Sequence, residues 1–158
     1  SNLGITHASK WRLHTSPQGT HTPLSSNLEE ADTDGRGMLG ASMTQSSGVF
    51  SFPVTGIWYI TFATEWYYNG DSRYLHNIIE TTVNGSAFDV AARGTCFIQI
   101  TGSNYTYSDA LCNFIFDVTN VSTHKVRFST DAGNGSVYLA AASDLDRTSM
   151  SFIRIGDT

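Results

Sequence analysis

The segment from residue 49 to residue 66, VFSFPVTGIWYITFATEW, constrains the fold of this chain more than any other. Pro53 and Gly56 break it into two strands joined by a turn. From Ile57 onward, apolar side chains occur on both faces of a strand with a period of two. One face carries Trp58, Ile60, Phe62 and Thr64, and the other carries Ile57, Tyr59, Thr61, Ala63 and Glu65. Because a solvated antiparallel strand has one clearly polar face, we expect this strand to be covered on both sides, by a second sheet and by a partner subunit.

The rest of the chain also favours strands over helices. Charged residues make up only 15% of the 158 residues, and the abundant Ser, Thr, Asn and Gly suit strands joined by tight turns. The Asn-Gly pairs at 84–85 and 134–135 are hairpin signals. Further strands are expected at 7–14, 74–83, 86–92, 95–101, 110–118, 124–129, 136–142 and 148–155, with 95–101 paired with 110–118, and a surface excursion at 15–47. About eight to ten short strands predict an all-β, two-sheet antiparallel sandwich.

Two resemblances extend this interpretation. The stretch GVFSFPVTGIWYITF at 48–62 resembles the signature of the tumour necrosis factor and complement first-component globular heads, with Trp58 where that family usually has Tyr. The closing strand TSMSFIRI stands where that family places its last, centrally buried strand. Pieces at 50–60, 73–75, 116–128 and 152–158 are similar to structural proteins of marine bacterial viruses.

The resemblances imply a tumour necrosis factor-like jelly roll of about ten strands. They also imply assembly as a three-fold trimer, with the inner sheets packed about the axis. Residues 1–158 are interpreted as one head domain, the C-terminal part of a longer chain. Residues on strand faces that the core does not need are expected near the three-fold axis: Tyr59, Thr61, Ile115 and Phe152.

Two segments mix aromatic and hydrogen-bonding side chains in the way that a glycan site requires. Aromatic rings stack on sugar faces, while Arg, Asp and Asn form hydrogen bonds with hydroxyl groups. The first segment supplies Trp66, Tyr67, Tyr68, Asn69, Asp71, Arg73 and Tyr74, and the second supplies Asn104, Tyr105 and Tyr107. The alternative is that these Tyr and Trp side chains simply pack at strand ends.

Other kinds of chemistry are not expected. The net charge of −5 and the lack of a basic patch argue against nucleic acid as a partner. No apolar run is long enough to insert in a membrane. Asp32, Asp34 and Gly35 resemble the start of a calcium loop, but Arg36 stands where an oxygen ligand belongs. We expect no catalytic site, no metal and no cofactor.

The state of the cysteines and the role of the glycosylation sequons can each be interpreted in two ways. Cys96 and Cys112 are expected to be buried free thiols, with a single disulfide as the alternative. Four Asn-x-Ser/Thr sequons could accept glycans or could arise by chance in a chain this rich in Asn, Ser and Thr. The four sequons begin at Asn84, Asn104, Asn120 and Asn134.

The sequence therefore predicts a non-enzymatic, trimeric head of a viral (phage) fibre, located on the virion. Its expected role is attachment to a host-surface receptor, with a polysaccharide as the expected ligand. Many copies, each binding weakly, would together bind more tightly through avidity. Two alternatives stay open. One is a virion decoration or capsid-fibre head without a defined receptor. The other is a secreted, extracellular complement-like lectin or ligand domain.

Overall fold

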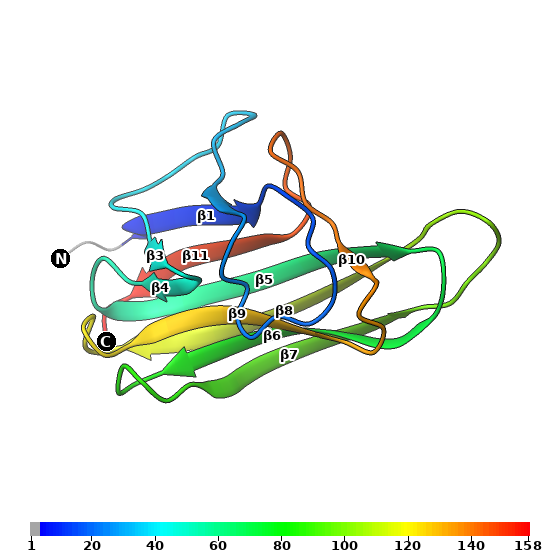
Figure 1. Ribbon diagram of the computed structural model, residues 1–158. Helices are drawn as coiled ribbons and strands as arrows, with labels where there is room; N and C mark the ends of the chain where they lie inside the picture. The colour runs from blue at the N-terminus through cyan, green and yellow to red at the C-terminus, as the bar shows by residue number, and fades with distance from the viewer. Residues whose placement is uncertain (1–3) are drawn as a thin grey trace.

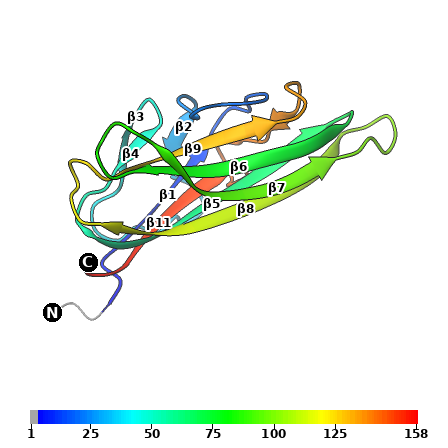
Figure 2. The same ribbon diagram turned by 90° about the horizontal axis from the view of Figure 1, so that it is seen from below.

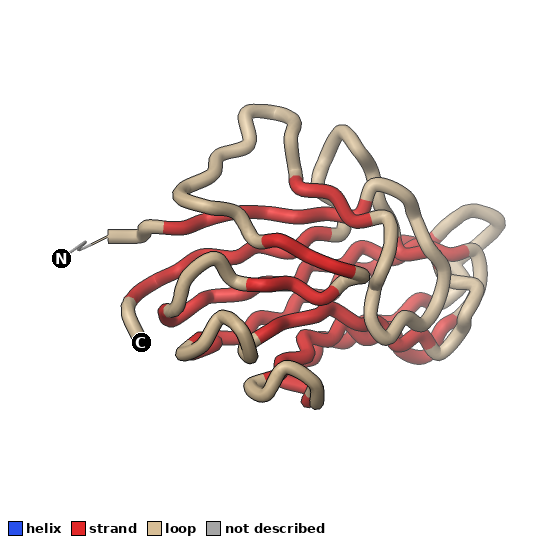
Figure 3. The backbone as a smooth tube through the Cα atoms, turned by 60° about the vertical axis from the view of Figure 1, so that its left-hand side comes forward, coloured by secondary structure: helices blue, strands red, loops and turns tan. Residues whose placement is uncertain are grey.

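The computed structural model describes residues 4–158 as a sandwich of two antiparallel sheets (Figures 1 and 2). The described residues contain strands and loops but no helix (Figure 3), and hence no helix that could cross a membrane. The strands are β1 (His7–Leu13), β2 (Leu28–Glu30), β3 (Thr44–Ser46), β4 (Val49–Ser51), β5 (Gly56–Tyr68), β6 (Ser72–Thr82), β7 (Asp89–Ile98), β8 (Thr106–Val118), β9 (Lys125–Ala132), β10 (Tyr138–Leu139) and β11 (Ser149–Gly156). The predicted all-β sandwich is confirmed.

The six-stranded sheet is built around β5. One edge of β5 pairs with β8, and the other pairs with β11 and, farther along, with β10. β11 then pairs with β1, and β1 with β2, so the closing strand is central as expected. The five-stranded sheet has the order β3-β4-β9-β6-β7. We use "outer face" for the side of the six-stranded sheet turned away from the five-stranded sheet.

Strand β5 behaves as its two-residue period predicts. Trp58, Ile60, Phe62 and Trp66 are buried, whereas the alternate side chains are only partly covered. Phe62 packs on Phe128 of the opposite sheet, with ring centroids 5.0 Å apart. The predicted inward set of the 110–118 strand is also correct, because Cys112, Phe116 and Val118 are buried and Phe114 packs against the core. The aromatic core thus lies between the two sheets.

Two predicted strand pairings are wrong. Residues 95–101 and 110–118 fall on β7 and β8, which lie at the edges of different sheets, so the loop at 99–105 crosses from one sheet to the other. Likewise β9 belongs to the five-stranded sheet and β10 to the six-stranded sheet, so residues 134–135 do not form a hairpin. The apolar side of a strand is buried by packing against the opposite sheet, so the pattern of apolar residues does not specify the strand's neighbour within its own sheet.

The excursion at 15–47 holds two short strands, β2 and β3. It contributes Leu24, Ala31 and Met43 to the buried core. The two thiols are free, with Cys112 buried and Cys96 half-buried, so no disulfide joins them in the structure.

The start of β1 and the end of β11 lie at one end of the sandwich in Figures 1 and 2. The opposite end is formed by the loops at 69–71, 99–105 and 133–137 (Figure 1). We call it the distal end. It brings together the ends of β5, β7 and β9 with the beginnings of β6 and β8, so side chains from distant parts of the chain can meet there.

Candidate functional site

The outer face of the six-stranded sheet carries a row of apolar side chains that crosses four strands. Residues paired directly across antiparallel strands lie side by side on one face. The pairs join Ile115 to Tyr59, Tyr59 to Ile153, Ile153 to Ala8, and Ala8 to Leu39 of the excursion. The side chain of Ile115 is 58% exposed and that of Leu39 is 51% exposed. We call this set the apolar row.

The rows on either side of the apolar row differ in chemistry. The next row towards the distal end is polar, with Asn113, Thr61, Ser151 and Lys10 in register. Beyond it, Leu111 is 61% exposed and pairs with Ala63. A hollow of about 440 Å³ opens there, lined by residues that include Leu111, Glu65 and Arg147. A row of polar side chains therefore separates two apolar stretches of this face.

The residues expected at a trimer axis fall into two groups. Tyr59, Thr61 and Ile115 lie on the outer face, where the alternation of β5 and β8 places them. Phe152 does not, because its side chain is fully buried between the sheets and packs on Phe50 and Phe128. The outward residue of β11 is its neighbour Ile153, which the sequence reasoning missed. A shift of one residue along a strand changes the face.

Four tyrosines cluster where the outer face meets the distal end. Tyr67 stacks on Tyr138 with ring centroids 5.0 Å apart and an interplanar angle of 9°. Its ring also contacts Tyr107 at 5.6 Å and, edge-on, Tyr105 at 5.1 Å. The structure therefore joins the two predicted aromatic segments through these rings. Tyr105 and Tyr107 are more than half exposed, so the cluster presents ring surface to solvent.

The charged groups beside this cluster are paired with each other. Arg147 donates a hydrogen bond to Glu65 at 2.5 Å, and its guanidinium lies 5.8 Å from the Tyr67 ring centroid. Hydrogen bonding to Glu65 raises the pKa of Arg147, and burial opposes this effect only in part. Neither Tyr138 nor Arg147 was selected from the sequence. The sequence gives little indication of their role, because they lie far along the chain from residues 65–74 and approach them only in the folded structure.

Several residues expected to bind a ligand have structural roles instead. Trp66 is wrong as a ligand residue, because its side chain is completely buried and its Nε1 donates to Thr64 Oγ1 at 3.1 Å. Tyr68 is half-buried, and its ring packs over Gly70 in the turn. Asn69 donates to the carbonyl of Ser103 at 3.2 Å and so ties two distal loops together. Asn104 is exposed in the loop at 99–105.

Arg73 and Tyr74 are exposed at the beginning of β6, as the sequence predicts. Asp71 lies beside them and accepts the backbone N–H of Ile100 at 2.7 Å through its side chain. Two open hollows flank Arg73, with volumes of about 420 Å³ and about 250 Å³. This second candidate surface faces away from the outer face, because Tyr74 stacks on His76 of the five-stranded sheet at 4.8 Å.

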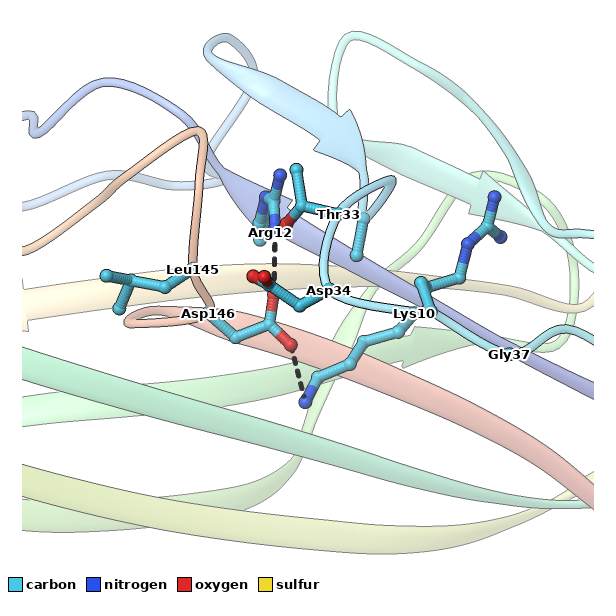
Figure 4. A pocket seen from close by; sticks show the side chains of 9 residues that line it. Lys10, Arg12, Thr33, Asp34, Gly37, Leu145 and Asp146 are labelled. Carbon is cyan, nitrogen blue, oxygen red and sulfur yellow. Dashed lines mark hydrogen bonds and ion pairs between the residues drawn. The ribbon is translucent and has the colours of Figure 1, made fainter.

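A polar network lies at the β1 edge of the outer face (Figure 4). Arg12 is 1% exposed and forms ion pairs with Glu29, Asp32 and Asp146 at 2.9, 3.0 and 3.3 Å. Lys10 also reaches Asp146, at 2.9 Å. A hollow of about 330 Å³ lies among these groups, but its buried charges are already paired. We interpret the network as a clamp that holds the excursion and the loop at 143–147 against β1.

Residues 4–158 offer no group of three or more His, Cys, Asp and Glu side chains that could hold a metal ion. No protein-family model matches the chain, and no curated protein sequence is similar to it. Solved structures do match. Eiger TNF from S. frugiperda superposes with a TM-score of 0.68 at 10% identity, over 98% of this chain and 95% of that one. This chain has the tumour necrosis factor fold.

Murine APRIL shows the same likeness. Its structure at pH 5.0 matches with a TM-score of 0.64 at 7% identity, over 94% of this chain and 98% of that one. The structure at pH 8.5 gives a TM-score of 0.64 at 8% identity. At such low identities the likeness establishes the tumour necrosis factor fold alone. What the chain binds has to be argued from its own surfaces.

Proposed function

We propose that the chain is a non-catalytic head domain that assembles as a homotrimer and binds a partner on a cell surface. The apolar row on the outer face carries this proposal. An antiparallel sheet with one free face normally turns polar side chains to water. Here Ile115, Tyr59 and Ile153 lie in one line across three adjacent strands, and contiguous exposed apolar surface of this kind is characteristic of interfaces.

A second copy of this chain is the partner that best fits the face. The apolar row lies beside a row of polar side chains. A second copy presents the same two rows, so apolar side chains can meet apolar ones and polar side chains can meet polar ones. The hollow lined by Ala63, Leu111 and Arg147 gives a neighbouring side chain a place to insert. Closed rotational symmetry satisfies all copies at once and leaves no surface open to further growth. The tumour necrosis factor fold favours three copies.

The proposed location is outside the cell. The names of the solved relatives support the reading as a ligand domain, which was the alternative at the sequence level. The viral fibre head is the second candidate. It rests on the sequence pieces at 50–60, 73–75, 116–128 and 152–158, and it shares with the first candidate a trimeric head that binds at a surface.

Two matched substitutions test this proposal. Ile115→Asp puts a charge into the apolar row, so it should convert the trimer to a monomer with unchanged strand content by circular dichroism. Val83→Asp changes a side chain of similar exposure, 62% against 58%, in the loop after β6 and should leave the trimer intact. Light scattering measures both masses.

The same pair tests binding at a surface. If three copies act together, the Ile115→Asp monomer loses avidity and should be released from target cells much faster than the Val83→Asp trimer. Equal masses for the two variants would refute the assembly through the outer face. Equal release from cells, with masses that differ, would refute the role of the trimer in attachment.

A further inference from the structure

The structure assigns to Arg73, Tyr74 and Phe97 a binding site for a sugar ring that carries a carboxylate. This inference rests on the proposed function and deepens it by naming the class of ligand. The site lies at the distal end, on the five-stranded sheet, away from the outer face proposed for assembly. Within the described residues, Arg73 forms no ion pair or side-chain hydrogen bond.

A β-bulge shapes the site. Ser72 pairs with Ile98 and Leu75 pairs with Cys96, so Arg73 and Tyr74 stand opposite Phe97 alone. A bulge of this kind directs side chains away from their regular positions and is frequent beside functional sites. As a result, an exposed guanidinium and two exposed rings share a short stretch of surface. Phe97 is 64% exposed and Tyr74 is 39% exposed.

Hydrogen bonds from the loop at 133–137 hold the bulge in place. The backbone N–H of Gly133 donates to the carbonyl of Tyr74 at 2.9 Å. The backbone N–H of Asn134 donates to Ser72 Oγ at 3.1 Å, and the Asn134 side chain donates to the carbonyl of Asp71 at 3.0 Å. Ser72 is buried and in turn donates to the carbonyl of Tyr74. Arg73 therefore projects from a fixed frame, which lowers the entropy that binding must overcome.

The free groups of the site define its ligand. The guanidinium offers paired N–H donors that match the two oxygens of a carboxylate. The ring of Tyr74, stacked on His76, and the ring of Phe97 offer flat apolar surface to the C–H face of a pyranose. The two hollows beside Arg73 also contain the exposed side chain of Gln99 and the turn at 133–135, which offer hydrogen bonds to hydroxyl groups.

The surroundings argue against other acidic partners. The chain has a net charge of −5, so a polymer with several charges on each unit is repelled at long range more strongly than one with a single carboxylate on each ring. An acidic peptide normally adds along a sheet edge or fills an extended groove. Here the two hollows measure about 420 Å³ and about 250 Å³, both lie against Asp71, and the larger one is also lined by the turn at 133–135, which suits a compact ring. A uronic acid, with one carboxylate on each ring, meets these conditions.

The test uses the whole chain and short oligomers of galacturonic acid, with the uncharged galactose oligomer of equal length as the reference ligand. Titration is followed by NMR or calorimetry. We expect the parent to bind the galacturonate at least tenfold more tightly than the galactose oligomer. Arg73→Gln should remove at least tenfold of that affinity, and Tyr74→Ala should weaken binding of both sugars.

The matched control is Arg93→Gln, which removes the same charge from the exposed face of β7 and should change affinity less than twofold. Equal losses for Arg73→Gln and Arg93→Gln would overturn the site. So would equal binding of the two sugars by the parent, or tighter binding of a polyglutamate peptide than of galacturonate. The mass of each sample is measured in parallel. A trimer that fails to bind refutes this site alone, whereas a monomer refutes the proposed assembly.

Discussion

Arg12 shows how a single residue fixes the longest irregular part of the chain. Its guanidinium is buried, and burial lowers its pKa, but the hydrogen bonds to Glu29 and Asp146 outweigh that effect and raise the pKa overall. Removing one partner of such a network leaves the others buried and unpaired, which costs more than the network itself contributes. The clamp therefore specifies where residues 28–37 lie on β1.

Asp146 gives this network a dependence on pH. Burial raises the pKa of its carboxyl group, but hydrogen bonds and ion pairs with Lys10 and Arg12 prevail and lower it. A lowered pKa in the folded state contributes stability that is complete above the unfolded pKa of about 4 and is lost as pH falls through the folded value. Asp146→Asn should therefore lower the free energy of unfolding by about 1–2 kcal/mol at pH 7.

The difference between parent and Asp146→Asn should shrink towards zero as pH falls below about 4. Urea unfolding at several pH values and one fixed protein concentration measures it. A difference that stays constant, or grows, in acid would contradict the role given to Asp146.

The buried thiol of Cys112 should be protected from chemical modification. Burial raises the pKa of Cys112 to about 11, and its Sγ–H donates to the carbonyl of Asn77. The thiolate is the reactive form, so Cys112 should react slowly with a thiol reagent at pH 8 in the folded protein. After unfolding without reductant, two thiols per chain should react. A count of zero would show that Cys96 and Cys112 are bridged.

The structure corrects the prediction for Trp66 and shows a role for the sequon asparagines. The two-residue period that correctly buried Trp58 and Phe62 continues to Trp66, so the burial of Trp66 was available from the pattern. It was missed because residues 66–74 were interpreted as a ligand-binding segment rather than as the end of the strand. Three sequons, at Asn84, Asn120 and Asn134, have a local role: each Oδ1 accepts the backbone N–H two residues later and shapes a turn.

At the scale of elements, Asn77 of β6 ties the two sheets together. Its side chain is fully buried, and its Nδ2 donates to the carbonyls of Phe62 and Ala110, at 2.9 and 3.0 Å. Its Oδ1 accepts the backbone N–H of Gly94 at 3.0 Å. A Cβ at Gly94 would lie 2.4 Å from that oxygen, so the close approach of β7 requires glycine. One amide thus connects β6 with β5, β7 and β8.

Asn77→Leu, which keeps the size of the side chain, should lower the free energy of unfolding by roughly 2–4 kcal/mol, because it leaves buried backbone groups without partners. Asn104→Leu, in an exposed loop, should change it by less than about 0.5 kcal/mol. Denaturant unfolding compares the two variants. Equal stabilities would mean that the Asn77 hydrogen bonds do not hold the sheets together.

The errors in strand pairing concern the sheet that each strand joins. Patterns along β5, β8 and β11 predict which side chains face the core, and most of those predictions are confirmed. They do not predict which sheet a strand joins, because the alternation along β7 or β8 indicates only which side of that strand faces the core. The tie through Asn77 is a contact between distant segments, so no local pattern reveals it.

For the molecule as a whole, the tumour necrosis factor fold was within reach of the sequence, because the stretch at 48–62 and the closing strand both stand where that fold needs them. The candidate surfaces were only partly within reach. The sequence selected Arg73 and Tyr74, and also Tyr59 and Ile115, and the structure places these residues on the two proposed surfaces. The apolar row and the tyrosine cluster depend on register between strands, which the sequence does not specify.

The mass of the unmodified chain in solution shows whether the outer face is an interface between copies. If the apolar row is an interface between copies, sedimentation equilibrium at micromolar concentration should give three times the chain mass of 17.2 kDa. The mass should hold on dilution and fall when Ile115 is replaced by Asp. A single species of 17.2 kDa at the same concentration, or a stable dimer, would contradict the account.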